Sequence, residues 1–78
     1  MELKNLVEFI VKALVDDQGS VEVREISGAQ SSVVEIRVAK EDVGKVIGRE
    51  GRIIAALRTI LGGAAARLEK RCILDIIE

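Results

Sequence analysis

The chain has 78 residues, enough for one domain and too few for two, and its 49% of apolar residues can form a hydrophobic core. It has no histidine for acid–base chemistry, and the single Cys72 excludes an internal disulfide and a cysteine metal site. The net charge of −1 hides an asymmetry, because residues 1–42 carry a net charge of −4 and residues 43–71 carry +5.

The chain begins with a predicted amphipathic helix over residues 2–16. Gly19 follows it and is expected to end the helix. Phe9, the only aromatic residue, is expected to contact the core or a partner. The prediction rests on aliphatic residues that recur every three or four positions, namely Leu3, Leu6, Val7, Ile10, Val11 and Leu14.

Two predicted strands follow. Apolar and charged residues alternate over residues 21–26, and a slip at Glu25 and Ile26 indicates a bulge or the strand's end. Residues 27–31 are typical of a turn. A second alternation predicts a strand that pairs antiparallel with the first, with its apolar positions at Val34, Ile36 and Val38.

The second half of the chain changes to helical spacing. Residues 40–46 predict a short helix, whose first-turn acids Glu41 and Asp42 suit the positive end of a helix dipole. A longer helix is predicted over residues 51–68, and residues 72–77 predict a last strand. That strand is apolar on both faces, which places it inside the sheet or near a partner. The apolar positions of the longer helix are Ile54, Leu57, Leu61 and Leu68.

The most informative stretch lies between the last two helices and holds two glycines with two residues between them. A glycine N–H can approach a phosphate closely, and the N-terminus of the following helix attracts anions. The excess positive charge surrounds and follows this stretch, although a solvated helix face would carry the same charges. The spacing alone fits a sugar-phosphate contact and an unliganded turn equally well. The stretch reads Val46-Ile47-Gly48-Arg49-Glu50-Gly51-Arg52-Ile53-Ile54.

This stretch, in this order of elements, resembles the signature of KH domains. The element order α-β-β-α-α-β is similar to the prokaryotic, type II form, which implies an α+β fold with a three-stranded mixed sheet and helices packed on one face. The resemblance covers residues 1–78 as a single KH domain, similar to the small bacterial single-KH proteins of the KhpA group. It implies a binder of single-stranded RNA, acting as an RNA chaperone or post-transcriptional regulator. The lone Cys72 fits a reducing cytoplasm, so we expect a cytoplasmic protein. The implied protein partners are a second copy (a homodimer) or a larger Jag-type KH protein (a heterodimer).

The resemblance also implies roles for individual residues. Gly48 and Gly51 would lie against the RNA backbone, and Arg49 would contact a phosphate. Because no aromatic residue lies outside the first helix to stack on bases, we expect weak, salt-dependent binding. The expected RNA contacts are Lys45, Val46, Ile47, Gly48, Arg49, Glu50, Gly51, Arg52 and Ile54. One wall of an apolar groove is expected from Val43, Val46, Ile47 and Ile54, and the opposite wall from Val34 and Ile36.

A second candidate surface lies on the longer helix. Gly62 and Gly63 each cost about 1 kcal/mol relative to alanine in a helix interior, so another advantage should offset that cost. Small residues form a flat stripe beside them, which predicts a self-association or partner face. Close packing on the first helix or on the sheet is the alternative. The predicted face consists of Ile53, Ala56, Thr59, Ile60 and Gly63, with a neighbouring stripe of Ala55, Thr59, Gly62 and Ala66.

The residues indicate binding rather than catalysis. Cys72 alternates with Leu74 and Ile76, which is typical of a core residue rather than a nucleophile. No carboxylate spacing indicates a metal site, and we expect no cofactor, no metal and no small-molecule substrate. No apolar run approaches the roughly 20 residues of a membrane span, and residues 1–5 lack the basic region of a signal peptide. The alternative function is a protein-interaction module that keeps the fold with little RNA binding.

Overall fold

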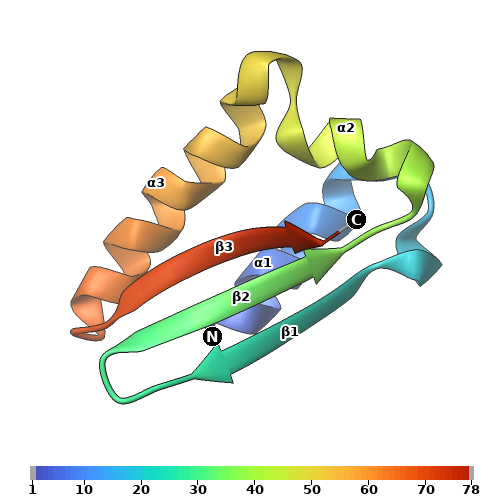
Figure 1. The fold of residues 1–78 in the computed structure, drawn as a ribbon. Coiled ribbons are helices and arrows are strands. Elements are labelled where there is room, and N and C mark those ends of the chain that lie inside the picture. Colours follow the sequence, from blue (N-terminus) through green and yellow to red (C-terminus); the bar gives the residue numbers. More distant parts are fainter. Residues whose placement is uncertain (1, 78) are drawn as a thin grey trace.

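The computed structural model describes residues 2–77, in which three α-helices and one three-stranded sheet alternate in the predicted order (Figure 1). The predicted α+β class is confirmed, and the element boundaries differ by at most three residues from the expected ones. Single 3₁₀ turns precede three of the elements, at η1 (Gln18–Ser20), η2 (Lys40–Asp42) and η3 (Arg49–Gly51). The main elements are α1 (Leu3–Leu14), β1 (Glu22–Ser27), β2 (Ser31–Arg37), α2 (Val43–Ile47), α3 (Arg52–Arg67) and β3 (Arg71–Ile77).

The sheet is mixed, with strand order β1-β2-β3. β1 and β2 form the predicted antiparallel hairpin, and β3 runs parallel to β2. The bulge expected at Glu25 and Ile26 is wrong, because both residues pair in register with β2, and the strand ends one residue later, at Ser27. The alternation slips there because Ile26 lies 55% exposed, so an apolar side chain occupies a solvent-facing position.

β3 lies at the edge of the sheet, so the expectation that the last strand lies inside the sheet is wrong. β2 is the central strand because the hairpin fills one of its edges and β3 fills the other. The two apolar faces of β3 differ in burial, since Leu74 is buried and Ile73 is 46% exposed. Contact of β3 with a partner stays a prediction.

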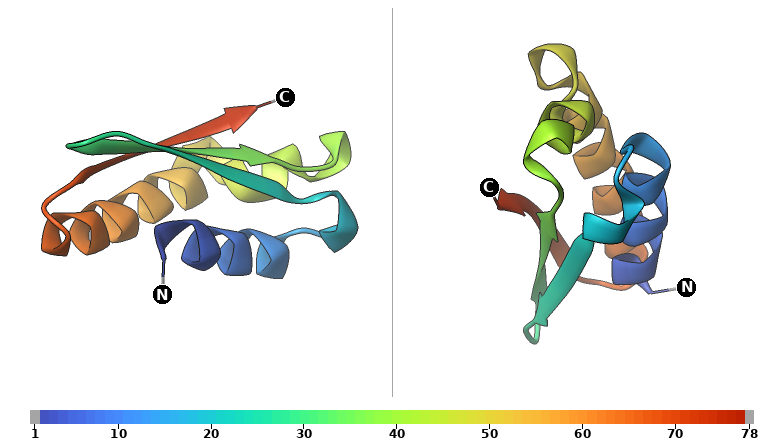
Figure 2. Two further views of the ribbon diagram at one scale, coloured as in Figure 1. Left: turned by 90° about the horizontal axis from the view of Figure 1, so that it is seen from below. Right: turned by 90° about the vertical axis from the view of Figure 1, so that its right-hand side faces the viewer.

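Helices α1 and α3 cover one face of the sheet and leave the other face open (Figure 2). The core lies between these layers. Phe9 is 71% exposed, so its expected core position is wrong, and its contact with a partner stays a prediction. Leu68 follows the last residue of α3 and is 57% exposed, while Ala65 fills the buried position one turn after Leu61. The buried apolar residues are Leu3, Val7, Val11, Val15, Val23, Val34, Ile36, Val38, Val46, Ile54, Leu57, Leu61, Ala65 and Leu74.

Within residues 2–77, none of the helices combines the length and the apolar character needed to cross a bilayer.

Candidate nucleic-acid interface

The connection between α2 and α3, which we call the glycine loop (residues 48–51), has a backbone that requires glycine. Gly48 has φ 78° and ψ 171°, a region that residues with a Cβ avoid. A Cβ at Gly48 would lie 2.5 Å from Cγ1 of Ile53 and 2.8 Å from its Cβ. Gly51 has φ 74° and ψ 16° in the left-handed region. The two glycines therefore create the sharp reversal between the helices.

The loop leaves two backbone amides free for a ligand. The N–H of Gly48 donates to the carbonyl of Gly44 at 2.8 Å, and the N–H of Gly51 donates to the carbonyl of Gly48 at 3.1 Å. The expectation that the glycine N–H groups face a phosphate is therefore wrong. In residues 2–77 no backbone carbonyl accepts from the N–H of Arg49 or Glu50. Glu50 adopts φ 56° and ψ 25°, and successive amides around such a residue form an anion-binding concavity.

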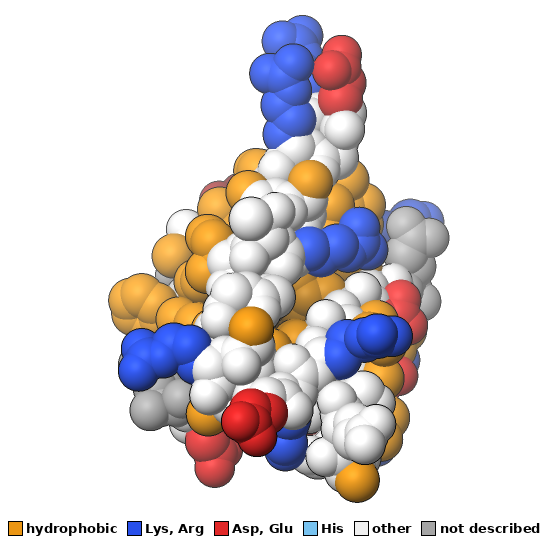
Figure 3. Space-filling model, turned by 90° about the vertical axis from the view of Figure 1, so that its left-hand side faces the viewer, with side chains coloured by type: hydrophobic (Ala, Val, Ile, Leu, Met, Phe, Trp, Pro, Cys, Tyr) orange, Lys and Arg blue, Asp and Glu red, His pale blue; other side chains and the backbone are white. Residues whose placement is uncertain are grey.

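The tip of the loop projects from the body and carries exposed charge of both signs (Figure 3). Arg49 is exposed. The Nη2 atom of Arg52 lies 3.5 Å from Oε2 of Glu50, and both side chains are more than 70% exposed. An exposed pair of this kind contributes little to stability, so Arg52 can exchange Glu50 for a phosphate at small cost. The two arginines are therefore available to an anion at the free amides.

The remaining cations after the loop do not gather at it. α3 has 16 residues, which corresponds to a length of about 24 Å. Arg67 stands at its far end, and Lys70 and Arg71 follow beyond. Lys70 donates to Oγ of Ser27 at 3.4 Å. The excess positive charge of residues 43–71 is thus spread along the molecule rather than concentrated at the loop.

Lys45, expected to contact RNA beside the loop, is paired with two carboxylates. Its Nζ donates to Oδ2 of Asp16 at 2.8 Å and to Oδ1 of Asp42 at 2.9 Å. These hydrogen bonds raise the pKa of Lys45 above its ordinary value, and the bond to Asp16 has a larger effect than the bond to Asp42. The pKa of Asp42 is lowered mainly by the hydrogen bond from Lys45 and to a smaller extent by the one from the N–H of Asp17. Lys45 therefore belongs to an ion-pair network.

Several residues expected to line the groove belong to the core instead. Val34 and Ile36 are fully buried, so the opposite wall assigned to them is wrong. Both belong to the core cluster that also contains the buried residues of α1 and α3. Val46 is also fully buried, and Ile54 is 7% exposed, so both support the loop from beneath rather than reach a ligand. Ile47 and Val43 are half-buried and remain at the surface.

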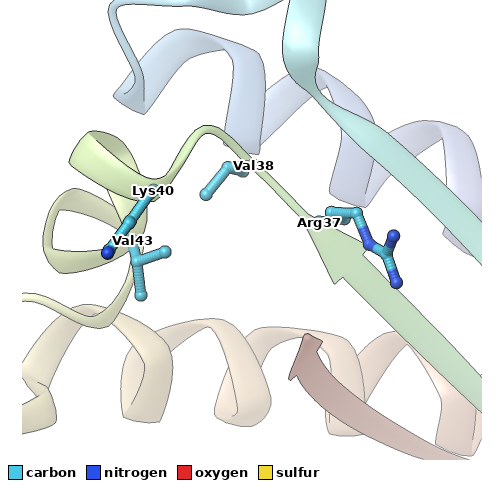
Figure 4. Close-up of a pocket in the computed structure, with 4 residues that line it drawn as sticks. All are labelled: Arg37, Val38, Lys40 and Val43. Carbon is cyan, nitrogen blue, oxygen red and sulfur yellow. The ribbon is translucent and has the colours of Figure 1, made fainter. Parts of the chain in front are cut away.

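A pocket of about 580 Å³ lies beside α2, at the carboxyl end of β2 (Figure 4). Val43 and Lys40 stand on one side of it, and Val38 and Arg37 on the other. Val43 was expected in a groove, whereas sequence reasoning missed Arg37, Val38 and Lys40. Their position in the sequence could have indicated them, because the segment that joins β2 to α2 must lie next to both elements. The pocket combines aliphatic surface with two cations.

The predicted partner face on α3 is open to solvent. Ile60 is 54% exposed, and a Cβ at Gly62 or Gly63 would meet no atom within 4 Å. Close packing on α1 or on the sheet is therefore wrong as an explanation for these glycines. Thr59 donates its hydroxyl to the carbonyl of Ala55 at 3.1 Å, which satisfies the polar group of the stripe. Ala56 and Gly63 are exposed, and Ile53 is half-buried.

Comparison with known protein families decides the identity of the fold. Residues 4–76 match the family described as KhpA/KhpB, KH domain. The chain belongs to this family. The glycine loop is accordingly the GxxG loop of a KH domain, and the predicted resemblance is confirmed.

Curated relatives in the family match over nearly their whole length. The protein named RNA-binding protein KhpA from Caldanaerobacter subterraneus subsp. tengcongensis is 54% identical over 92% of this chain and 96% of its own. The proteins of the same name from Borreliella burgdorferi and Clostridium acetobutylicum are 49% and 48% identical, over 94% and 96% of this chain and 89% and 100% of theirs. No solved structure matches the chain.

Proposed function

We propose that this protein binds single-stranded RNA at the GxxG loop and in the adjacent pocket. The observation that carries the proposal is the pair of free amides of Arg49 and Glu50 at an exposed tip that also bears two arginines. The names of the relatives, RNA-binding protein KhpA, support the same function. Amides, guanidinium groups and aliphatic surface can hold a sugar-phosphate chain and its bases, and they offer no acid–base pair for catalysis.

The proposed binding mode divides the RNA between two parts of the site. A phosphate accepts from the amides of Arg49 and Glu50 and pairs with the guanidinium groups of Arg49 and Arg52. Neighbouring nucleotides reach the pocket, where Val38 and Val43 contact bases and the flanking cations contact phosphates. Without aromatic stacking the affinity is low. If the four cations of the site, Arg37, Lys40, Arg49 and Arg52, each contact a phosphate, the slope of log K against log salt is about −3.

The test replaces Arg49 and Glu50 by aspartate together, which makes the loop repel phosphate without touching the core. Binding is measured by fluorescence anisotropy with a labelled random-sequence RNA of about 12 nucleotides, three times the length that one such loop clamps. Arg24→Asp on β1 is the matched control, because it is exposed and also changes the charge by two units. We expect a loss of binding in the loop variant only. Equal retention by the loop variant and the control would refute the proposal.

A second function, protein–protein contact through the open face of α3, is favoured by the solvent-exposed Gly62 and Gly63. The glycines lower helix stability by about 1 kcal/mol each and fill no internal space, so a partner helix is the proposed reason for them. We propose a second copy of the chain, or a larger Jag-type KH protein as the resemblance implies. Paired domains would also raise the affinity for RNA through effective concentration.

Sedimentation of the wild type and of Gly63→Glu tests this face. A self-associating wild type and a monomeric, folded variant are expected. A folded wild type that stays monomeric at high concentration, with no Jag-type partner captured in a defined two-component mixture, would refute it. The proposed cellular role, in the cytoplasm, is that of an RNA chaperone or post-transcriptional regulator.

A further inference from the structure

A buried aspartate joins the start of α2 to the connection between α1 and β1. Asp42 is 2% exposed and precedes α2 in the N-cap position, yet it does not cap that helix. Its Oδ2 accepts from the N–H of Asp17 at 3.0 Å, and its Oδ1 accepts from Nζ of Lys45 at 2.9 Å. Lys45 also reaches Asp16 at 2.8 Å. We call the three side chains of Asp16, Asp42 and Lys45 the carboxylate clasp.

The clasp contacts α2, a helix too short to be stable or fixed in direction without tertiary contacts. α2 has five residues, which is too short for independent stability, so tertiary contacts must fix its direction. Val46 fixes one side by its burial in the core. The clasp fixes another by the ion pair of Lys45 with Asp16, 29 positions away, and by the hydrogen bond from the N–H of Asp17 to Asp42, 25 positions away. The last residue of α2, Ile47, is followed directly by Gly48.

The orientation of α2 determines the position of the GxxG loop, because hydrogen bonds connect the two. The N–H of Gly48 continues the hydrogen bonds of α2 by donating to the carbonyl of Gly44 at 2.8 Å. The carbonyl of Gly48 in turn accepts from the N–H of Gly51 at 3.1 Å. The loop is therefore fixed to the end of α2, and a change in the angle of α2 moves the free amides of Arg49 and Glu50.

The charge of the clasp opposes RNA rather than attracting it. Two carboxylates and one ammonium group give the cluster a net charge of −1, so it repels a polyanion. Lys45 already shares its charge with both carboxylates, and moving its ammonium group to a phosphate would leave the buried Asp42 without its cation, which is costly. A contribution of these residues to RNA binding must therefore come from geometry.

We propose that Asp42 and Lys45 are positioning residues that hold the GxxG loop in its RNA-binding orientation, and that Lys45 itself makes no phosphate contact. The inference rests on the proposed RNA binding and adds residues outside the loop to the site. Simple electrostatics predicts that the loss of a negative charge beside the site strengthens RNA binding, whereas positioning by the clasp predicts that the loss of Asp42 weakens it.

The decisive comparison is Asp42→Asn against Glu41→Gln. Both changes remove one acid at neighbouring positions, but Glu41 is exposed and forms no ion pair within the described residues. Electrostatics alone predicts that both variants bind RNA slightly more tightly. If Asp42→Asn lowers the fraction of molecules with a correctly placed loop to about 10–30%, its apparent Kd rises about three- to tenfold. Binding by Asp42→Asn as tight as that of Glu41→Gln would overturn the proposal.

The salt dependence separates positioning from contact. The loss of one phosphate contact to a single strand reduces the slope of log K against log salt by about 0.7. We expect this reduction in Arg49→Gln, and we expect Lys45→Gln to bind more weakly with an unchanged slope. Equal reductions in the two variants would make Lys45 a phosphate contact and overturn the second half of the proposal.

Two further measurements keep the outcome clear. If Asp42→Asn does not fold, Asp16→Asn breaks half of the clasp at a side chain that is 87% exposed, and it must also weaken binding. The amide resonances of Gly48 and Gly51 are compared without RNA in Asp42→Asn (or Asp16→Asn) and Glu41→Gln. Shifts confined to the clasp variant support positioning, and unchanged shifts refute it. These resonances decide the question even if the wild type fails to bind RNA, which would refute the proposed function alone.

Discussion

Replacement of Gly48 by alanine tests the geometry on which the site depends. The new Cβ would lie 2.5 Å from Cγ1 and 2.8 Å from Cβ of Ile53, closer than nonbonded carbons approach. The contact with the Cβ cannot be relieved by a side-chain rotation, because that atom is fixed to the backbone of α3. The strained backbone costs about 1–3 kcal/mol, and the overpacking costs about 1–3 kcal/mol more. We therefore expect a loss of about 2–6 kcal/mol in the free energy of unfolding.

Two other glycines serve as matched controls. Gly51→Ala has the backbone penalty without the clash, since its Cβ would lie 4.0 Å from the nearest side-chain atom, and it should cost about 1–2 kcal/mol. Gly44→Ala lies inside α2 with no atom within 4 Å and should stabilise the protein by about 0.4–1 kcal/mol.

Urea unfolding followed by circular dichroism measures the three variants against the wild type. The expected order of stability is Gly44→Ala, wild type, Gly51→Ala and Gly48→Ala, from highest to lowest. A loss for Gly48→Ala no greater than that for Gly51→Ala would show that Ile53 does not fill the space beside Gly48, and it would refute the loop geometry described above.

Four further outcomes follow from burial and charge. Leu61→Ala should cost about 2–5 kcal/mol in urea unfolding, whereas Ile60→Ala, one residue away and exposed, should change stability by less than about 0.5 kcal/mol in a monomeric sample. Gly62→Ala should stabilise α3 by about 0.4–1 kcal/mol, and a thermal melt that shows destabilisation would contradict the open space around it. The pKa of Asp42 is lower in the folded than in the unfolded protein. The ionised carboxylate therefore stabilises the fold above the ordinary pKa of 3.8, and this stabilisation is lost as the pH falls through the folded pKa. The stability difference between wild type and Asp42→Asn, measured by urea unfolding at several pH values, should therefore shrink below pH 3.8 and stay constant between pH 5 and 7. Burial, and to a smaller extent the nearby charge of Glu25, raises the pKa of the Cys72 thiol. Alkylation of Cys72 by iodoacetamide at pH 8 should therefore be slower than alkylation of free cysteine, and an equal rate would contradict the partial burial.

Local sequence patterns predicted the elements and the loop because each pattern acts over a few residues. The spacing of Val7 and Val11 defines the buried side of α1 wherever that helix packs. The hairpin of β1 and β2 follows from a connection too short for any other pairing. The loop between α2 and α3 needs glycine at Gly48 and Gly51 because the backbone there has positive φ, and that requirement is visible from the chain itself.

The amino-acid sequence by itself determined the order of helices and strands, the α+β class and the position of the GxxG loop. Only the tertiary structure decided that β3 lies at the edge, that the pocket forms between Arg37 and Val43, and that Lys45 is held by Asp16 and Asp42. The physical reason is the distance along the chain over which each feature is set. Helix periodicity and glycine backbone angles are local properties, whereas strand neighbours, burial and ion pairs depend on segments that meet only when the whole chain has folded.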